Sequence, residues 1–169
     1  MHPIIRTSRL VITYFDESMA KNVHLNSLDQ DNRRFVPDEV FETEQDAKET
    51  IMYLIECYQT TDGPFVYPIV LNSGENIGYV QAIPISDEWE VGYHIAEKFT
   101  NKGYATEALS AFVPYVMEKI GIKQLVGVCH GDNIASRKVL EKCGFNLIFQ
   151  SIESYHGQQQ NVYKYIYKI

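Results

Sequence analysis

Residues 101–106, Asn-Lys-Gly-Tyr-Ala-Thr, form the stretch of this chain whose residue types best suit the binding of an anion. Gly103 stands just before a run of apolar residues at helical spacing, so its neighbours form the start of a helix. The first N–H groups of a helix have no partners within it and attract anions, and a glycine lets a phosphate approach the backbone. We therefore expect a pyrophosphate-binding turn made by Asn101, Lys102, Gly103, Tyr104, Ala105 and Thr106.

Two other phosphate-binding patterns fit this stretch poorly. A P-loop needs Gly-x-x-x-x-Gly-Lys-Ser/Thr, and the stretch has neither that spacing nor the Lys-Ser/Thr pair. A dinucleotide-binding turn needs Gly-x-Gly-x-x-Gly after the first strand of a βαβ unit, and only Gly103 matches it. A turn whose backbone alone wraps the anion needs neither pattern. An ordinary helix start that binds no ligand is the alternative.

The residue pattern around the turn predicts the elements that hold it in place. Alternating or β-branched runs predict strands at 8–15, 65–71, 76–85, 89–95, 123–130, 146–155 and 161–169. Helical spacing predicts helices at 19–28, 43–59, 104–120 and 133–144, with residues 29–42 as an acidic loop. Thr43 and Asp46 suit a capping box, and Gly121 suits a helix end. This order indicates a mixed α/β fold in one domain, residues 1–169, with helices packed on a partly antiparallel sheet.

Composition and charge exclude several functional classes. The net charge of −7 argues against a nucleic-acid partner, and no apolar run approaches a membrane span, so we expect a cytoplasmic protein. Three cysteines without Cys-x-x-Cys spacing and five unpaired histidines predict neither a disulfide framework nor a metal site. Residues 1–89 carry 6 Lys and Arg against 15 Asp and Glu, whereas residues 90–169 carry 9 against 7. This asymmetry suits an anion bound by the second part and a cation bound by the first, although a solvated acidic surface also explains it.

Three motifs, in order along the chain, resemble those of the GCN5-related N-acetyltransferases (GNAT). Residues 89–109 resemble the acetyl-CoA-binding segment of that family, and residues 120–145 resemble its second signature, a strand, Asn-x-x-Ser and a helix ending in Lys-x-Gly-Phe. Residues 4–15, with Thr-x-Arg-Leu, resemble the RimJ/RimL branch of ribosomal-protein N-terminal acetyltransferases. The resemblance covers nearly the whole chain. It implies an α/β fold with a mostly antiparallel sheet, a central splay between two parallel strands, flanking helices, and acetyl-CoA as co-substrate.

The resemblance also implies roles for individual residues. Backbone N–H groups in the strand before the turn would contact the pantetheine arm and the thioester oxygen; by position these belong to His94, Ile95 and Ala96. Asn133 would bind the pantetheine arm, and Ser136 would contact CoA and protonate the departing thiolate; a helix-capping or first-turn serine is the alternative for Ser136.

Two carboxylates match places where family members carry a catalytic base. Glu90 is one and Glu153, in the manner of the RimL-like branch, is the other; a surface carboxylate or cross-strand partner is the alternative for Glu90. His130 is a further candidate base, and a loop histidine whose hydrogen bonds are satisfied is the favoured alternative. The chain also departs from the family, because Thr100 replaces an Arg or Gln of the turn and Leu140 replaces a Tyr that serves as an acid.

The implied activity is acetyl transfer to a primary amine, directly within a ternary complex. Residues 29–46 fall where the family builds its acceptor pocket, and their carboxylates suit a cationic acceptor, whereas Arg33 and Arg34 suit an acidic part of it. We expect Cys129 and Cys143 to be buried, and neither to be an acetyl carrier. A non-catalytic acyl-CoA-binding module and an acyltransferase for a different acyl-CoA are the alternatives, and the protein is either a monomer or a homodimer.

Overall fold

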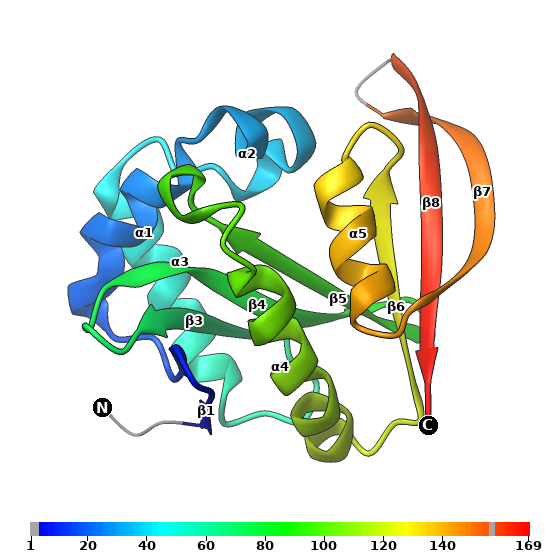
Figure 1. Ribbon diagram of the computed structural model, residues 1–169. Coiled ribbons are helices and arrows are strands. Elements are labelled where there is room, and N and C mark those ends of the chain that lie inside the picture. The colour runs from blue at the N-terminus through cyan, green and yellow to red at the C-terminus, as the bar shows by residue number, and fades with distance from the viewer. Residues whose placement is uncertain (1–3, 156–157) are drawn as a thin grey trace.

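In the computed structural model, which describes residues 4–155 and 158–169, eight strands form one sheet in the order β1-β2-β3-β4-β5-β6-β8-β7 (Figure 1). The strands are β1 (Ile5–Arg6), β2 (Leu10–Ile12), β3 (Phe65–Leu71), β4 (Asn76–Ile85), β5 (Glu88–Ile95), β6 (Gln124–His130), β7 (Asn146–Tyr155) and β8 (Gln158–Lys168). The α-helices are α1 (Ala20–Ser27), α2 (Gln30–Phe35), α3 (Glu44–Cys57), α4 (Tyr104–Ile120) and α5 (Ile134–Lys142). Short 3-10 helices are η1 (Glu17–Met19), η2 (Pro37–Glu39) and η3 (Glu97–Phe99).

The centre of the sheet is splayed, as the family resemblance implied. β5 and β6 are parallel and pair only at Glu90↔Val126 and Val91↔Gly127, whereas the other described neighbours are antiparallel. Beyond this short ladder β5 continues to Ile95 and β6 continues to His130 without pairing with each other. The expected fold class is therefore confirmed, and the two strands open a gap in the middle of the sheet.

Helices cover both faces of the sheet (Figure 1). On one face α4 and α5 pack in the larger core, which includes Phe112, Leu109 and Leu140 together with Tyr67 of β3. On the other face α1 and α3 enclose a smaller core around Ile51. Each large apolar side chain removed from water in this way contributes about 1.5–3 kcal/mol, so the two cores hold the splayed strands in place.

Local signals in the sequence set the ends of three helices. The capping box at the start of α3 is confirmed, because Thr43 Oγ1 accepts from the Asp46 N–H at 3.1 Å and Asp46 Oδ2 accepts from the Thr43 N–H at 3.0 Å. Gly121 ends α4 with φ 78°, as expected of a left-handed C-terminal glycine. Asn133 caps α5 through its side chain, which accepts from the Ser136 N–H at 3.1 Å.

Two sequence-based expectations for the N-terminal part were wrong. The expected strand 8–15 is shortened to β2, with the two-residue β1 before it, because residues 7–9 turn away to bond with α4 and the Phe15 N–H donates to the Tyr58 hydroxyl at 3.3 Å. The acidic loop contains the helix α2, which the sequence pattern did not reveal. Asn32 ties this helix back to the end of α1 by donating to the Ser27 carbonyl at 3.2 Å.

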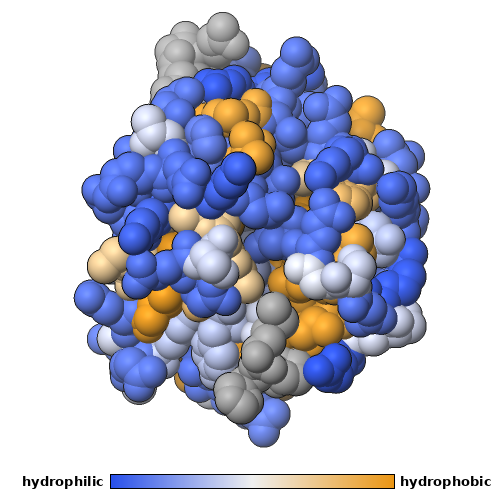
Figure 2. Space-filling model, turned by 90° about the vertical axis from the view of Figure 1, so that its left-hand side faces the viewer, coloured by the Kyte–Doolittle hydropathy of each residue, from blue (hydrophilic) through white to orange (hydrophobic). Residues whose placement is uncertain are grey.

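The described surface is mostly polar on the side of the molecule that carries α1. Figure 2 shows this side as largely hydrophilic, with small and separate apolar patches. Among the helices of residues 4–155 and 158–169, none is long and apolar enough to cross a membrane.

Candidate active site

Two cavities meet where β5 and β6 diverge. The first, called here the turn cavity, has a volume of ≈ 400 Å³ and lies between the turn before α4 and the start of α5. The second, called here the strand cavity, has a volume of ≈ 430 Å³ and lies between the splayed strands and the α2–η2 segment. Their linings share Asp31, Phe35, Tyr93, His94, Asn133 and Ser136. Because the walls are shared, molecules bound in the two cavities would lie next to each other.

The turn cavity ends at the N-terminus of α4, where the sequence predicted an anion site. Gly103 has φ 80°, a left-handed conformation that favours glycine, and none of the described side chains caps this helix end. Gly103, Tyr104, Ala105 and Thr106 all line the cavity. The unpaired N–H groups of this first turn can therefore receive an anion from the cavity.

Two lysines that the sequence reading did not single out contribute to the same cavity. Lys138 and Lys142 lie one turn apart on α5, and both line the turn cavity opposite the α4 turn. Their spacing of four residues places them on one side of the helix. A polyanion such as the phosphates of CoA would therefore meet backbone N–H groups on one side and two cations on the other.

The Thr-x-Arg-Leu motif near the N-terminus holds this turn in position. Glu107 of α4 accepts from Thr7 Oγ1 at 2.6 Å, Ser8 Oγ at 3.1 Å, the Arg9 N–H at 3.0 Å and Arg9 Nε at 2.6 Å. Arg9 also donates to the Lys102 carbonyl at 2.9 Å and lies over the Tyr104 ring. Partial burial raises the pKa of Glu107, but the bonds from Thr7, Arg9 and Ser8 outweigh it and lower that pKa below its usual value.

The predicted backbone contacts of β5 need a correction. The Ala96 N–H donates to the carbonyl of Ile77, on β4, at 2.8 Å, so it does not point into the gap between β5 and β6. Hydrogen-bonded and non-bonded pairs alternate along an antiparallel ladder, and β4 and β5 pair without a register shift. The His94 N–H therefore also faces β4, and the N–H groups of Tyr93 and Ile95 face the gap.

Most of the predicted cofactor-binding residues nonetheless gather around the turn cavity. Its lining includes His94, Ile95, Asn101, Gly103, Tyr104, Ala105, Thr106, Asn133 and Ser136. Ala96 and Lys102 lie outside that lining. The exposed Lys102 side chain lies over the Phe99 ring instead, and its Nζ donates to the Lys98 carbonyl at 3.3 Å.

Ser136 and Tyr93 form a hydroxyl pair in the wall that the two cavities share. Tyr93 Oη lies 2.9 Å from Ser136 Oγ and donates to the Ser136 carbonyl at 2.8 Å. Burial raises the pKa of Tyr93 above its usual value, so the phenol keeps its proton at neutral pH. Tyr93 was not predicted as a side chain of the site, because β5 was expected to contribute its backbone. At position 140, Leu140 is 1% exposed and packs into the core over Gly127.

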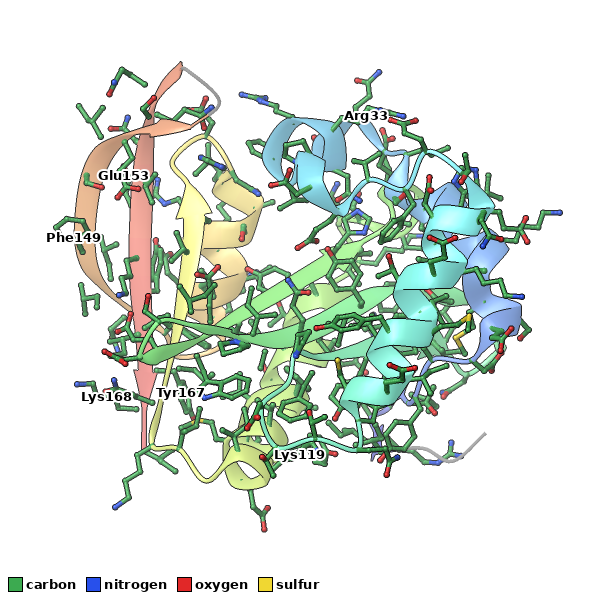
Figure 3. All side chains as sticks on the ribbon, turned by 180° about the vertical axis from the view of Figure 1, so that it is seen from behind. Arg33, Lys119, Phe149, Glu153, Tyr167 and Lys168 are labelled. Atoms are coloured by element: carbon green, nitrogen blue, oxygen red, sulfur yellow. The ribbon has the colours of Figure 1, made fainter. Side chains whose placement is uncertain are left out.

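The strand cavity is rich in carboxylates, including both predicted bases. Glu90 and Glu153 line it, together with Asp31 and Glu39 of the α2–η2 segment. Glu153 lies on β7, and Figure 3 shows it to one side of α2 and its Arg33, near the same end of the molecule. Burial, with smaller contributions from the negative charges of Glu39 and Glu88, raises the pKa of Glu90 to about 7 against a lowering by Lys164. Glu90 can therefore both accept and release a proton near neutral pH.

The remaining candidates also have definite positions. His130 lines the strand cavity and stacks on Phe35, and burial lowers its pKa. Cys129 lines it too, and burial raises the pKa of its thiol to about 11.

The two arginines expected to bind an acidic part of the acceptor, Arg33 and Arg34, form ion pairs elsewhere. Arg33 bonds to Glu42 at 2.6 and 3.1 Å, Arg34 bonds to Asp132 at 3.2 Å, and neither lines the turn cavity or the strand cavity.

Within the described part of the chain, no three His, Cys, Asp or Glu side chains are grouped so that they could hold a metal ion.

Known proteins share this sequence pattern and this fold. The sequence model of one protein family, the acetyltransferase (GNAT) domain, matches residues 9–146 of this chain. YnaD of Bacillus subtilis (strain 168), described as an uncharacterized N-acetyltransferase, is 28% identical over 143 residues, which is 83% of this chain and 81% of that protein. A GNAT-family acetyltransferase from Bacillus anthracis has a solved structure with a TM-score of 0.84, 23% identity and 97% of each chain covered.

A structure of RimL, a ribosomal L7/L12 alpha-N-protein acetyltransferase, in complex with coenzyme A has the same fold. It has a TM-score of 0.84 and 22% identity, with 99% of this chain and 98% of that chain covered. The family model spans most of the chain, and the relatives identified by sequence are N-acetyltransferases. This chain therefore belongs to the GNAT acetyltransferase family and is an N-acetyltransferase.

Proposed function

We propose that the protein transfers the acetyl group of acetyl-CoA directly to a primary amine, with both substrates bound at once. The observation that carries this proposal is the meeting of two cavities of similar size at the β5–β6 splay. The turn cavity suits acetyl-CoA, because it combines an uncapped helix N-terminus with Lys138 and Lys142. RimL, which shares the fold, has been solved with coenzyme A. The strand cavity then receives the amine.

The residues at the junction supply the proton transfers that the reaction needs. A protonated amine is not a nucleophile, so Glu90, directly or through a water molecule, removes its proton. The thiolate that leaves receives a proton from the Ser136 hydroxyl, which lies 2.9 Å from Tyr93 Oη, and the second proton that the attacking nitrogen loses as the amide forms restores this hydroxyl. The N–H groups of Tyr93 and Ile95 face the gap and are placed to stabilise negative charge on the acetyl oxygen.

Direct transfer agrees with the state of the cysteine in the strand cavity. A covalent acetyl carrier would need a thiolate, and the buried Cys129 thiol, with its pKa raised to about 11, stays protonated at neutral pH. The acceptor remains either a protein N-terminus, as in the RimJ/RimL branch, or a small-molecule amine.

The cofactor site is tested by titrating acetyl-CoA into the wild type and into Gly103→Glu by calorimetry. The substitution places a negative side chain at the helix end where the phosphates would lie, so affinity should fall by about a hundredfold or more. Gly121→Glu is a matched control, since Gly121 has nearly the same positive φ at the other end of α4 and open space around it. Equal affinities in all three proteins would contradict the assignment of the turn cavity.

Turnover is tested by measuring thiol release from acetyl-CoA in the presence of a panel of amines. Release that depends on an amine supports the proposed enzyme. Binding of acetyl-CoA without release on any amine would instead favour a non-catalytic acyl-CoA-binding module, and release only from longer acyl-CoA would favour a different acyltransferase.

A further inference from the structure

Glu39 of η2 is one of two carboxylates of the acidic segment, residues 29–46, that line the strand cavity. Other carboxylates of residues 29–46 have different tasks: Glu42 pairs with Arg33, Asp46 caps α3, and Asp29 accepts from the Glu97 N–H at 2.7 Å. Glu39 and Asp31 remain in the cavity lining. The sequence alone predicted that the acidic loop lies near the acceptor. In the structure, Asp31 and Glu39 are the carboxylates of this segment that line the strand cavity.

The position of Glu39 depends on a specific arrangement of β4 and β5. Gln81 of β4 donates to Glu39 Oε1 at 3.0 Å. Its side chain reaches Glu39 by crossing Gly92 of β5, where an added Cβ would lie 2.7 Å from Gln81 Nε2. A larger residue at position 92 would therefore displace Gln81 and with it Glu39. Gly92 lies two residues from Glu90, so the same strand positions both carboxylates.

Glu39 has no cationic partner among the described residues. Its Oε2 atom is buried without a hydrogen-bond partner there, and it takes part in no ion pair within that part of the chain. No Lys or Arg of the described residues lines the strand cavity, and burial lowers the pKa values of its two histidines, His94 and His130. A carboxylate in such surroundings is costly unless a cation or a set of donors compensates it.

Asn32 carries a second buried oxygen that lacks a hydrogen-bond donor among the described residues. Its side chain is 1% exposed and lines the same cavity. Asn32 Nδ2 donates to the Ser27 carbonyl, which identifies the other end of the amide as the oxygen, and this Oδ1 has no partner among the described residues. Glu39 Oε2 and Asn32 Oδ1 are both acceptors, so the group that would satisfy them is a donor, as an ammonium is.

We propose that Glu39, supported by Asn32, binds a second positively charged group of the acceptor, so that the enzyme selects amines that carry an additional cation. This inference rests on the proposed transfer of acetyl to an amine in the strand cavity. One amino group of the acceptor then reacts beside Glu90, while the other cation is held by Glu39.

The rival explanation for the two unpaired oxygens is a water molecule in a small cavity beside the α2–η2 segment. This cavity, ≈ 20 Å³, is lined by Asn32, Glu39 and Asn76, and Asn76 Nδ2 is also buried without a partner among the described residues. A single water could donate to the two oxygens and accept from Asn76. In that case Glu39 would be structural and would not distinguish one amine from another.

The test compares pairs of acceptors that differ in a second positive charge. The pairs are 1-aminobutane with 1,4-diaminobutane, and a tripeptide with a neutral second residue with the same tripeptide carrying lysine there. The wild type should favour the dicationic member of a pair by about tenfold or more in kcat/KM. Glu39→Gln should remove that preference, because it should raise KM for the dication more than for the monocation. Glu39→Asp, which keeps the charge, should restore part of it.

Asp38→Asn is the matched control, because Asp38 is an exposed neighbour that lies outside the cavity lining and should leave the preference unchanged. Unchanged calorimetric affinity for acetyl-CoA shows that each variant is folded. An identical preference in the wild type and Glu39→Gln, or none in the wild type, would overturn the inference while the acetyltransferase stands. Lack of turnover of every amine by the wild type would instead count against the proposed function.

Discussion

At the scale of single residues, the chemistry depends most on Glu90. Its carboxyl lines the strand cavity, and burial together with nearby negative charge raises its pKa to about 7. A carboxyl with an ordinary pKa would be ionised throughout the neutral range but would be a weak base. The raised pKa makes the Glu90 carboxylate a stronger base, with a proton affinity closer to that of the amine whose proton it would remove.

Replacement of Glu90 by Gln should therefore lower kcat/KM by about 10² to 10⁴. Only the deprotonated form acts as a base, so the wild-type kcat/KM should rise with pH through about 7 and level off above it. Initial rates of thiol release between pH 5.5 and 8.5 measure both effects. Glu153→Gln is the comparison, because Glu153 lines the same cavity while remaining exposed. A large loss in Glu153→Gln alone would make Glu153 the base.

At the scale of elements, the start of α4 depends on contacts from a distant part of the chain. Four donors from Thr7, Ser8 and Arg9 converge on the Glu107 carboxylate and fasten the turn that contains Gly103. Glu107→Gln should lower the free energy of unfolding by about 1.5–3 kcal/mol, which is the range for a hydrogen bond to a charged group. Affinity for acetyl-CoA should fall several-fold as well, because the turn loses its support. Denaturant unfolding and calorimetry measure the two effects.

The contribution of Glu107 to stability should depend on pH in a defined direction. Its pKa in the folded protein is lower than its ordinary value of 4.5, so the ionised form is favoured by folding. The difference between wild type and Glu107→Gln should therefore be full above that ordinary value and shrink as the pH falls through the lowered pKa. Glu118→Gln, an exposed carboxylate near the other end of α4, is the control. A difference that grows on acidification would contradict the role of Glu107.

At the scale of the whole molecule, the fold joins a carboxylate-rich cavity and a cavity that contains two lysines at one splay. The charge difference between residues 1–89 and 90–169 anticipated this division in part, because Glu39 belongs to the first part and Lys138 and Lys142 to the second, whereas Asp31 of the first part lines both cavities. Glu90 and Glu153 depart from it, since the second part of the chain also contributes carboxylates to the strand cavity.

Much of the fold could be read from the sequence where local signals act alone. β3, β4 and β7 have their predicted bounds, and the capping box of α3 and the glycine stop of α4 are properties of a few adjacent residues. The helix α2 was missed because its short polar sequence carries no apolar period, and its Asn32 is held by a tertiary contact.

The site could be predicted only in part, because some of its features depend on contacts between distant parts of the chain. The backbone turn at Gly103 is local and was identified, whereas the direction of the Ala96 N–H depends on pairing with another strand. The seven carboxylates of residues 29–46 cannot be ranked by sequence, because only the path of Gln81 over Gly92 singles out Glu39. Tyr93 was overlooked because its hydroxyl reaches Ser136 across the splay.

The most direct test of transfer between two adjoining cavities is the pattern of initial rates when acetyl-CoA and a productive amine are varied together. If both substrates must be bound before the acetyl group moves, double-reciprocal plots at several amine concentrations should give lines that intersect. Parallel lines would show that CoA leaves before the amine reacts, as in covalent catalysis. That result would contradict direct transfer at the β5–β6 splay.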